Sequence, residues 1–240
     1  MKIEYTKYNH MNSLSRVKDT LDTIDEVYKE SNTIPNRNTL TDQNGFYVNI
    51  TVLHVDIRKS KKLFDNNSYA VLSKIYRLYI SEVMAVLKGN KNICEVGIEG
   101  DGIWAVFDAS LNNHVEDVLQ TAGQISSLID ILNIKFSKRK YPKLTIGIGI
   151  DSGKSLYMKT GYTSTDFNEV VWIGKVFGKA AKYSDYGNRE IDDKELMISK
   201  LVYNSLIDEY KELFIWNENR SCYHGNLINQ DMNTWVELNR

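Results

Sequence analysis

Hydrophobic residues along the middle of the chain follow two different periods. Short runs rich in aromatic and β-branched residues predict buried strands, and longer stretches with an apolar residue at every third or fourth position predict amphipathic helices. In chain order these patterns predict a strand at 46–55, a helix at 72–87, strands at 92–98 and 103–107, a helix at 115–136 and a strand at 144–150. The order β-α-β-β-α-β predicts an α+β fold of the ferredoxin-like, split βαβ type, an antiparallel sheet with helices on its faces.

Both ends of the chain add elements to this centre. Residues 11–30 carry an apolar stripe at helical spacing, and the polar residues of 31–45 predict a loop; the stripe consists of Leu14, Val17, Leu21 and Ile24. We therefore expect an N-terminal amphipathic helix and loop at 1–45 and a main domain at 46–240. After residue 150 the pattern predicts a strand at 170–173, a helix at 174–184 and short strands at 213–216 and 221–224.

The amino-acid composition excludes some classes of function but says little about the fold. The 240 residues include 30 Lys and Arg against 31 Asp and Glu, a net charge of −1, so no general attraction to nucleic acid or to a membrane surface is expected. No apolar run approaches the roughly 18 residues of a membrane span. Cys94 and Cys222 lack metal-ligand spacing, and we expect them to be buried thiols of a cytoplasmic protein.

Two carboxylates are the strongest candidates for chemistry. Asp56 ends the first predicted strand of the sheet, and Asp101 occupies the turn of the next hairpin. In a split βαβ sheet these two elements are neighbours, so the carboxylates can converge on a divalent cation such as Mg²⁺, which also binds substrate phosphates. The alternative is that each Asp only caps a helix or a turn. The pair in this topology favours a phosphoryl-transfer site.

Four segments in this order resemble the class III nucleotide cyclases, which close a nucleoside triphosphate to a 3′,5′-cyclic monophosphate. The segments are Val52–Ser60, Gly100–Phe107, Leu144–Gly153 and Ile173–Lys182. The resemblance covers about residues 46–185. It implies a catalytic domain with two Mg²⁺ or Mn²⁺ ions per site and a homodimer whose active sites are shared between the chains.

Carried over residue by residue, the resemblance assigns the metal and phosphate positions. Asp56 and Asp101 fall on the two metal-ligand positions, and the backbone of Ile57 falls on the third. The N–H groups from Ile57 to Ser60, together with Arg58, are the candidates for binding the β- and γ-phosphates. Arg58 as an ordinary surface charge is the alternative. All of the metal machinery of the family is therefore expected here.

The departures from the family pattern concern the base and the transition state. Gly97 and Val171 stand where purine cyclases carry polar base-reading side chains, so the usual purine contacts are missing. Gly178 and Lys182 stand where the family has its transition-state Asn and Arg; Lys182 keeps the charge without the guanidinium geometry. Lys175 and Lys179 are further candidates for that charge. The sequence thus predicts a changed base pocket on an intact metal site.

Kept metal ligands and a changed base pocket resemble the bacterial pyrimidine cyclases of the Pycsar antiphage defence system. That resemblance implies conversion of UTP or CTP to cyclic UMP or cyclic CMP, a product that acts on a separate effector protein. Two alternatives remain open. The first alternative is an adenylate or guanylate cyclase with atypical base recognition, and the second is an inactive cyclase-like module that binds a nucleotide.

Overall fold

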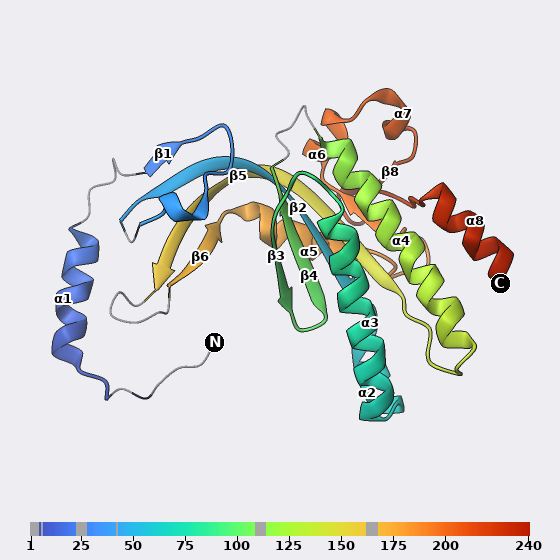
Figure 1. Cartoon of the computed structure of the whole chain (residues 1–240). Helices are drawn as coiled ribbons and strands as arrows, with labels where there is room; N and C mark the ends of the chain where they lie inside the picture. Colours follow the sequence, from blue (N-terminus) through green and yellow to red (C-terminus); the bar gives the residue numbers. More distant parts are fainter. Residues whose placement is uncertain (1–4, 6, 23–27, 42, 109–113, 162–167) are drawn as a thin grey trace.

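The computed structural model describes residues 5, 7–22, 28–41, 43–108, 114–161 and 168–240 (Figure 1). The sheet runs in the order β3-β4-β2-β5-β7-β9-β8, with β1 paired to β2 and β6 paired to β5. The strands are β1 Tyr28–Glu30, β2 Gly45–Ile57, β3 Ile93–Glu99, β4 Gly102–Phe107, β5 Ile146–Gly161, β6 Asn168–Ile173, β7 Leu196–Ile198, β8 Ile215–Asn217 and β9 Cys222–Gly225. The helices are α1 His10–Leu21, α2 Ser60–Asn66, α3 Tyr69–Lys88, α4 Val115–Ser137, α5 Lys175–Tyr186, α6 Lys200–Ser205, α7 Asp208–Lys211 and α8 Gln230–Asn239.

The predicted β-α-β-β-α-β centre is confirmed. β2, β3, β4 and β5 are its strands, with α3 and α4 as the helices between them. These strands lie in the order β5-β2-β4-β3, and each neighbouring pair is antiparallel, which is the ferredoxin-like arrangement. Gly100 in the turn before β4 has a positive φ of 64°, a conformation that glycine adopts without steric cost. This turn presents Asp101 at the end of the sheet.

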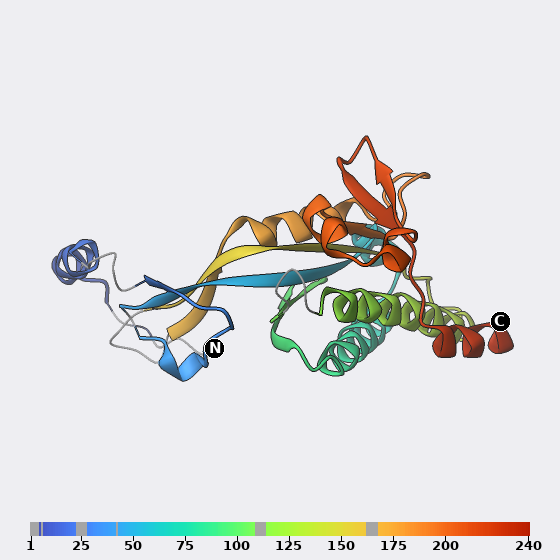
Figure 2. The ribbon, with the colours of Figure 1, turned by 90° about the horizontal axis from the view of Figure 1, so that it is seen from above.

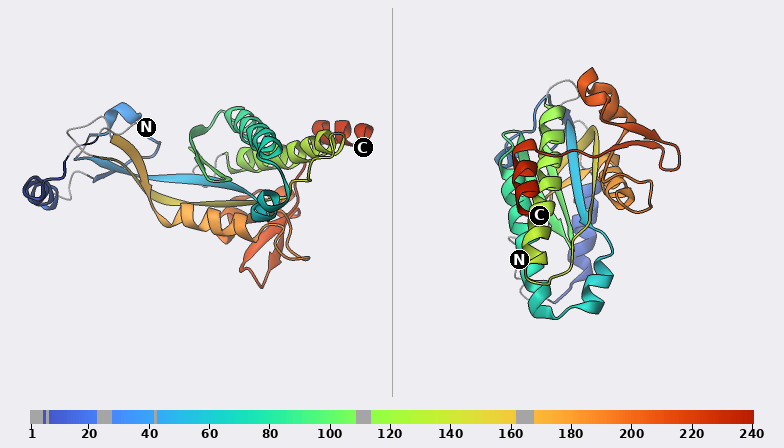
Figure 3. Two further views of the ribbon diagram at one scale, coloured as in Figure 1. Left: turned by 90° about the horizontal axis from the view of Figure 1, so that it is seen from below. Right: turned by 90° about the vertical axis from the view of Figure 1, so that its right-hand side faces the viewer.

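The two faces of the sheet carry different helices (Figures 2 and 3). α3 and α4 cover one face through the larger apolar core, to which Val55, Ile75 and Ile125 belong. α5 lies on the other face, over a smaller core that includes Val52 and Val106. Side chains alternate between the two faces along a strand. Every second residue counted from Val52 on β2, and from Val106 on β4, therefore faces α5.

Glycines in β5 explain the close packing of α5. A Cβ built on Gly149 would lie 2.1 Å from the carbonyl oxygen of Ala180, and one on Gly147 would lie 2.1 Å from that of Ser184. Both oxygens belong to the backbone of α5, so no side chain could move to make room. The alternating Ile/Gly pattern of this strand therefore buries isoleucines on one face and admits the helix backbone on the other.

The N-terminal region differs from the sequence-based expectation. The helix predicted over 11–30 ends at Leu21, and Tyr28–Glu30 instead forms β1, parallel to the start of β2. Leu14, Val17 and Leu21 of the stripe are exposed, whereas Ile24 lies outside the described residues. A strand forms at 28–30 because the edge of β2 offers unpaired backbone groups there, a tertiary effect that overrides the helical pattern.

The C-terminal part adds elements that the pattern did not indicate. The strands predicted at 213–216 and 221–224 correspond to β8 and β9, but β7 and helices α6, α7 and α8 were missed. Cys222 is buried as expected, whereas Cys94 is exposed, which corrects the expectation of two buried thiols. Among the described residues, no helix combines the length and the hydrophobicity needed to span a bilayer.

Candidate active site

Asp56 and Asp101 lie at the same end of the sheet. In the antiparallel pair of β2 and β4, Val55 is opposite Ile103, so the next step of the ladder brings Asp56 level with the turn that holds Asp101. Burial and the negative charge of Asp101 both raise the pKa of the Asp56 carboxyl, burial being the larger cause. The structure thus brings together two carboxylates that are far apart in the sequence.

The carboxylate pair has the donor set of a hard divalent cation. Oδ2 of Asp101 is buried and has no hydrogen-bond partner among the described residues, which is unfavourable for a carboxylate unless a cation or donor meets it. No cluster of three or more His, Cys, Asp or Glu side chains suited to a metal occurs in the described ranges. Two carboxylates, a backbone oxygen such as that of Ile57, water and substrate phosphate would together suit Mg²⁺.

Arg58 connects the carboxylate pair to α5. Its Nη2 donates to Oδ2 of Asp56 at 2.6 Å, and its Nη1 donates to the carbonyl of Asp185 at 2.7 Å and to Oδ1 of the same residue at 3.2 Å. The side chain is only 9% exposed. The sequence predicted Arg58 as a phosphate ligand; in this structure its guanidinium instead bridges two carboxylates within the chain.

Some of the backbone N–H groups after β2 that were predicted to bind phosphate are already hydrogen-bonded within the chain. The N–H of Arg58 donates to the carbonyl of Thr145 at 2.7 Å, which removes it from the groups available to a ligand. Ser60 is the first residue of α2, after Lys59 in a left-handed conformation with φ of 56°. The backbone at Lys59 and Ser60 therefore remains as the candidate phosphate contact of this segment.

Two tyrosines of α3 lie behind the carboxylates and were not predicted as site residues. Burial and the charges of Asp101 and Asp56 raise the pKa of Tyr76 to about 12, and its hydroxyl is buried with no partner among the described residues. Tyr79 is fully buried and donates to the carbonyl of Val55 at 3.4 Å. The helical spacing of apolar residues predicted that Tyr79 is buried. The only sequence signal for a polar surrounding was the hydroxyl groups of the tyrosines, because a buried hydroxyl needs a hydrogen-bond partner.

Helix α5 carries the predicted transition-state positions. Lys182 is exposed, and its ammonium lies 5.6 Å from the ring centroid of Tyr186. Gly178 is exposed too, with nothing within 4 Å of where a Cβ would be. Lys179 is also exposed, and its Nζ lies 3.8 Å from Oδ2 of the buried Asp151. Within the described ranges, no hydrogen bond, ion pair or ring contact joins Lys182 to Asp56 or Asp101, whereas Asp185 of the same helix reaches Asp56 through Arg58.

The two predicted base-pocket positions have different surroundings. Gly97 on β3 pairs with Trp104 on β4, and the indole lies directly over it. On β6, Val170 and Trp172 pack on the α5-side core, while Val171 is half-buried and belongs to neither core. The structure therefore places an aromatic ring over the first position. At the second position the two neighbours of Val171, Val170 and Trp172, face the α5-side core, and Val171 itself does not.

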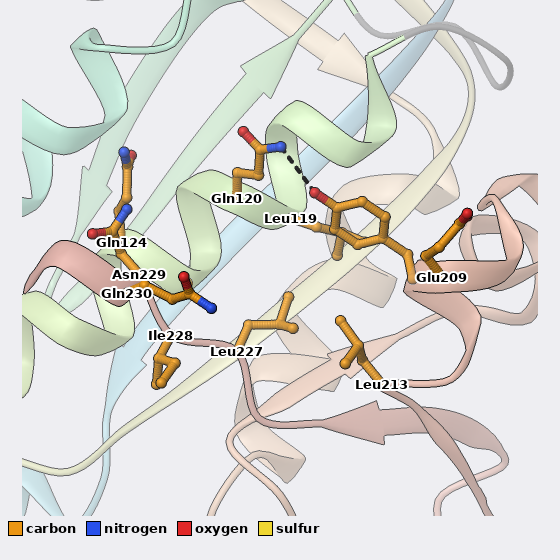
Figure 4. Close-up of a pocket in the computed structure, with 11 residues that line it drawn as sticks. Leu119, Gln120, Gln124, Glu209, Leu213, Leu227, Ile228, Asn229 and Gln230 are labelled. Carbon is orange, nitrogen blue, oxygen red and sulfur yellow. Dashed lines mark hydrogen bonds between the residues drawn. The ribbon is translucent and has the colours of Figure 1, made fainter. Parts of the chain in front are cut away.

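A separate hollow lies away from these residues (Figure 4). It measures about 590 Å³ and is bounded by α4, the segment around α7 and the residues that lead into α8. Gln120 spans it by donating to the Tyr210 hydroxyl at 2.8 Å. None of the predicted site residues lines this hollow, so it is not the site that Asp56 and Asp101 define.

Comparison with known proteins places the chain in a family. A uridylate cyclase of Treponema porcinum is 30% identical over 234 residues, which cover 96% of this chain and 81% of the relative. The chain belongs to the uridylate cyclase family. A second uridylate cyclase, from Gulbenkiania mobilis, is 29% identical and aligns over the full length of both chains. No protein-family model matches the chain.

A solved structure confirms that this chain has the fold of the class III nucleotide cyclases. The crystal structure of the guanylyl cyclase Cya2 superposes with a TM-score of 0.62 at 14% identity, covering 78% of this chain and 95% of the other. At such identity the likeness concerns the fold alone. The protein is thus a nucleotide cyclase by its family, and its fold is that of such enzymes.

Proposed function

We propose that this protein converts UTP to 3′,5′-cyclic UMP and pyrophosphate. The observation that carries the proposal is the similarity to two uridylate cyclases along nearly the whole chain. The base positions support it, since neither Gly97 nor Val171 can hydrogen-bond the edge of a purine through its side chain. CTP is the close alternative, because both pyrimidines have one ring and differ only in their hydrogen-bonding groups.

In the proposed reaction the ribose 3′-oxygen attacks the α-phosphorus. The O3′–P bond forms, the bond from that phosphorus to the pyrophosphate oxygen breaks, and the 3′-hydroxyl proton is lost to solvent. Asp56 and Asp101 would hold two Mg²⁺ or Mn²⁺ ions, which lower the charge of the phosphates and favour ionisation of the 3′-hydroxyl. Lys182 would approach the α-phosphate as a point charge. These residues act by positioning and by charge neutralisation.

The active sites of the proposed enzyme are shared in a homodimer. Lys182 makes no contact with the carboxylate pair of its own chain within the described ranges, so a second copy is the natural source of the missing half. A two-fold dimer would then hold two equivalent sites, each with Asp56 and Asp101 from one chain and α5 from the other. The cyclic nucleotide would act as a signal on a separate effector protein, in bacterial antiphage defence.

The test is to incubate pure protein with each of the four ribonucleoside triphosphates and Mn²⁺ and to identify the products by mass spectrometry. We expect cyclic UMP as the main product, with cyclic CMP as the next. Cyclic AMP or cyclic GMP as the main product would instead establish a purine cyclase with atypical base recognition. Nucleotide binding without any cyclic product would establish an inactive module.

A further inference from the structure

Trp104 occupies the space above Gly97. A Cβ added at Gly97 would lie 2.2 Å from Cζ2 and 2.3 Å from Cε2 of this indole, far inside van der Waals contact. The two residues are paired in the antiparallel hairpin of β3 and β4, so the ring of one covers the bare backbone of the other. Any side chain at position 97 and the indole in its present place therefore exclude each other.

The indole is held from the side by α5. The ring of Phe177 meets that of Trp104 edge to face at a centroid distance of 5.4 Å, and Phe177 directly precedes Gly178 on the helix. Such edge-to-face pairs stabilise a particular ring orientation beyond simple burial. The position of Trp104 is thus tied to the helix that carries Gly178 and Lys182.

A second layer of contacts braces the same group of rings. Trp172 of β6 lies 6.3 Å from Phe177 and donates its indole N–H to Oε2 of Glu95 at 2.9 Å. Tyr157 packs on Trp172 at a centroid distance of 4.3 Å. Gly97 on β3 therefore lies beside an aromatic cluster that reaches β6 through Trp172, whereas the side chain of Val171, the neighbour of Trp172 on that strand, alternates to the other face.

Trp104, Trp172 and Phe177 are all half-buried, and Trp104 is the tryptophan of this cluster whose N–H is free, among the described residues, to meet a ligand. The indole N–H of Trp104 has no hydrogen-bond partner in the part of the chain that the structure describes. By contrast, the N–H of Trp172 is satisfied by Glu95. A partly exposed ring with a free donor can stack on a base and donate to a carbonyl oxygen of it.

We propose that Trp104 is the specificity-determining wall of the base pocket. Its indole fills the room that a two-ring base or a base-reading side chain at position 97 would need, and its exposed part offers ring surface and one N–H donor to a one-ring base. This inference rests on the proposed pyrimidine cyclase function and names the residue that selects the substrate. Selection is by shape, so removing the ring should relax it rather than reverse it.

The test compares Trp104→Ala and Trp104→Phe with wild-type protein in kcat/KM for UTP, CTP, ATP and GTP. We expect Trp104→Ala to raise KM for UTP by between about fivefold and hundredfold, the loss of one base–aromatic stack. We also expect the ratio of purine to pyrimidine kcat/KM to rise at least about tenfold. Trp104→Phe keeps a stacking ring and should retain most of the pyrimidine preference. Quenching of tryptophan fluorescence by UTP should be largest in the wild type.

Trp235→Ala is the matched control. Trp235 is also half-buried, but it lies on α8 beside Lys135 of α4, on the opposite face of the sheet; its loss should leave the substrate ratios unchanged. Circular dichroism and thermal melting verify that each variant is folded. Folded Trp104 variants with the wild-type UTP KM and substrate ratio would overturn the inference while leaving the uridylate cyclase function standing. A wild-type protein that makes no cyclic pyrimidine nucleotide would refute both the inference about Trp104 and the proposed function.

Discussion

At the scale of single residues, the carboxylate pair gives the sharpest prediction. Asp56→Asn or Asp101→Asn should reduce cyclic nucleotide formation below detection, because a neutral amide loses most of the attraction for a divalent ion. In metal-free protein, Asp101→Asn should raise the melting temperature, since the pair repels itself and Oδ2 of Asp101 has no partner among the described residues. Added Mn²⁺ should stabilise the wild type and not the variant. Turnover by either purified variant at the wild-type rate would contradict the metal assignment.

Gly97→Lys is the second prediction at this scale. The new side chain restores a purine contact of the class III pattern, but its Cβ alone would strike the indole of Trp104. We expect the variant to lose pyrimidine cyclisation without gaining ATP cyclisation, measured by product mass with each triphosphate. The double variant Gly97→Lys with Trp104→Ala removes the clash and tests whether the contact then functions. Efficient cyclic AMP synthesis by the single variant would show that Gly97 alone sets the base preference.

At the scale of elements, the packing of α5 on β5 predicts opposite effects for two glycines. Gly149→Ala forces a Cβ against the backbone of α5, so we expect a loss of about 2 kcal/mol or more in the free energy of unfolding. Gly178→Ala has open space around it within the helix and should gain about 0.5–1 kcal/mol. Urea denaturation followed by circular dichroism measures both. Equal effects of the two changes would mean that α5 does not pack on β5 as described.

At the scale of the whole molecule, the proposed shared site predicts complementation. An Asp56→Asn chain and a Lys182→Ala chain should each be inactive, and their mixture should recover about a quarter of the wild-type activity. Random exchange makes half of the dimers mixed, and each mixed dimer has one site with both groups intact. Subunit exchange is verified with differently tagged chains. An exchanged mixture that stays inactive, or an active monomer in light scattering, would refute the shared site.

The sequence by itself determined the central β-α-β-β-α-β order and the two carboxylates. Periodic apolar residues make those elements, and Gly100-Asp101-Gly102 makes the turn, from interactions between near neighbours in the chain. Only the tertiary structure decided the features that depend on distant contacts. β1 forms because β2 offers it an edge, Arg58 turns to Asp56 and Asp185, and the indole of Trp104 lies over Gly97. Local patterns do not record such contacts, because each partner is chosen by how the whole chain packs.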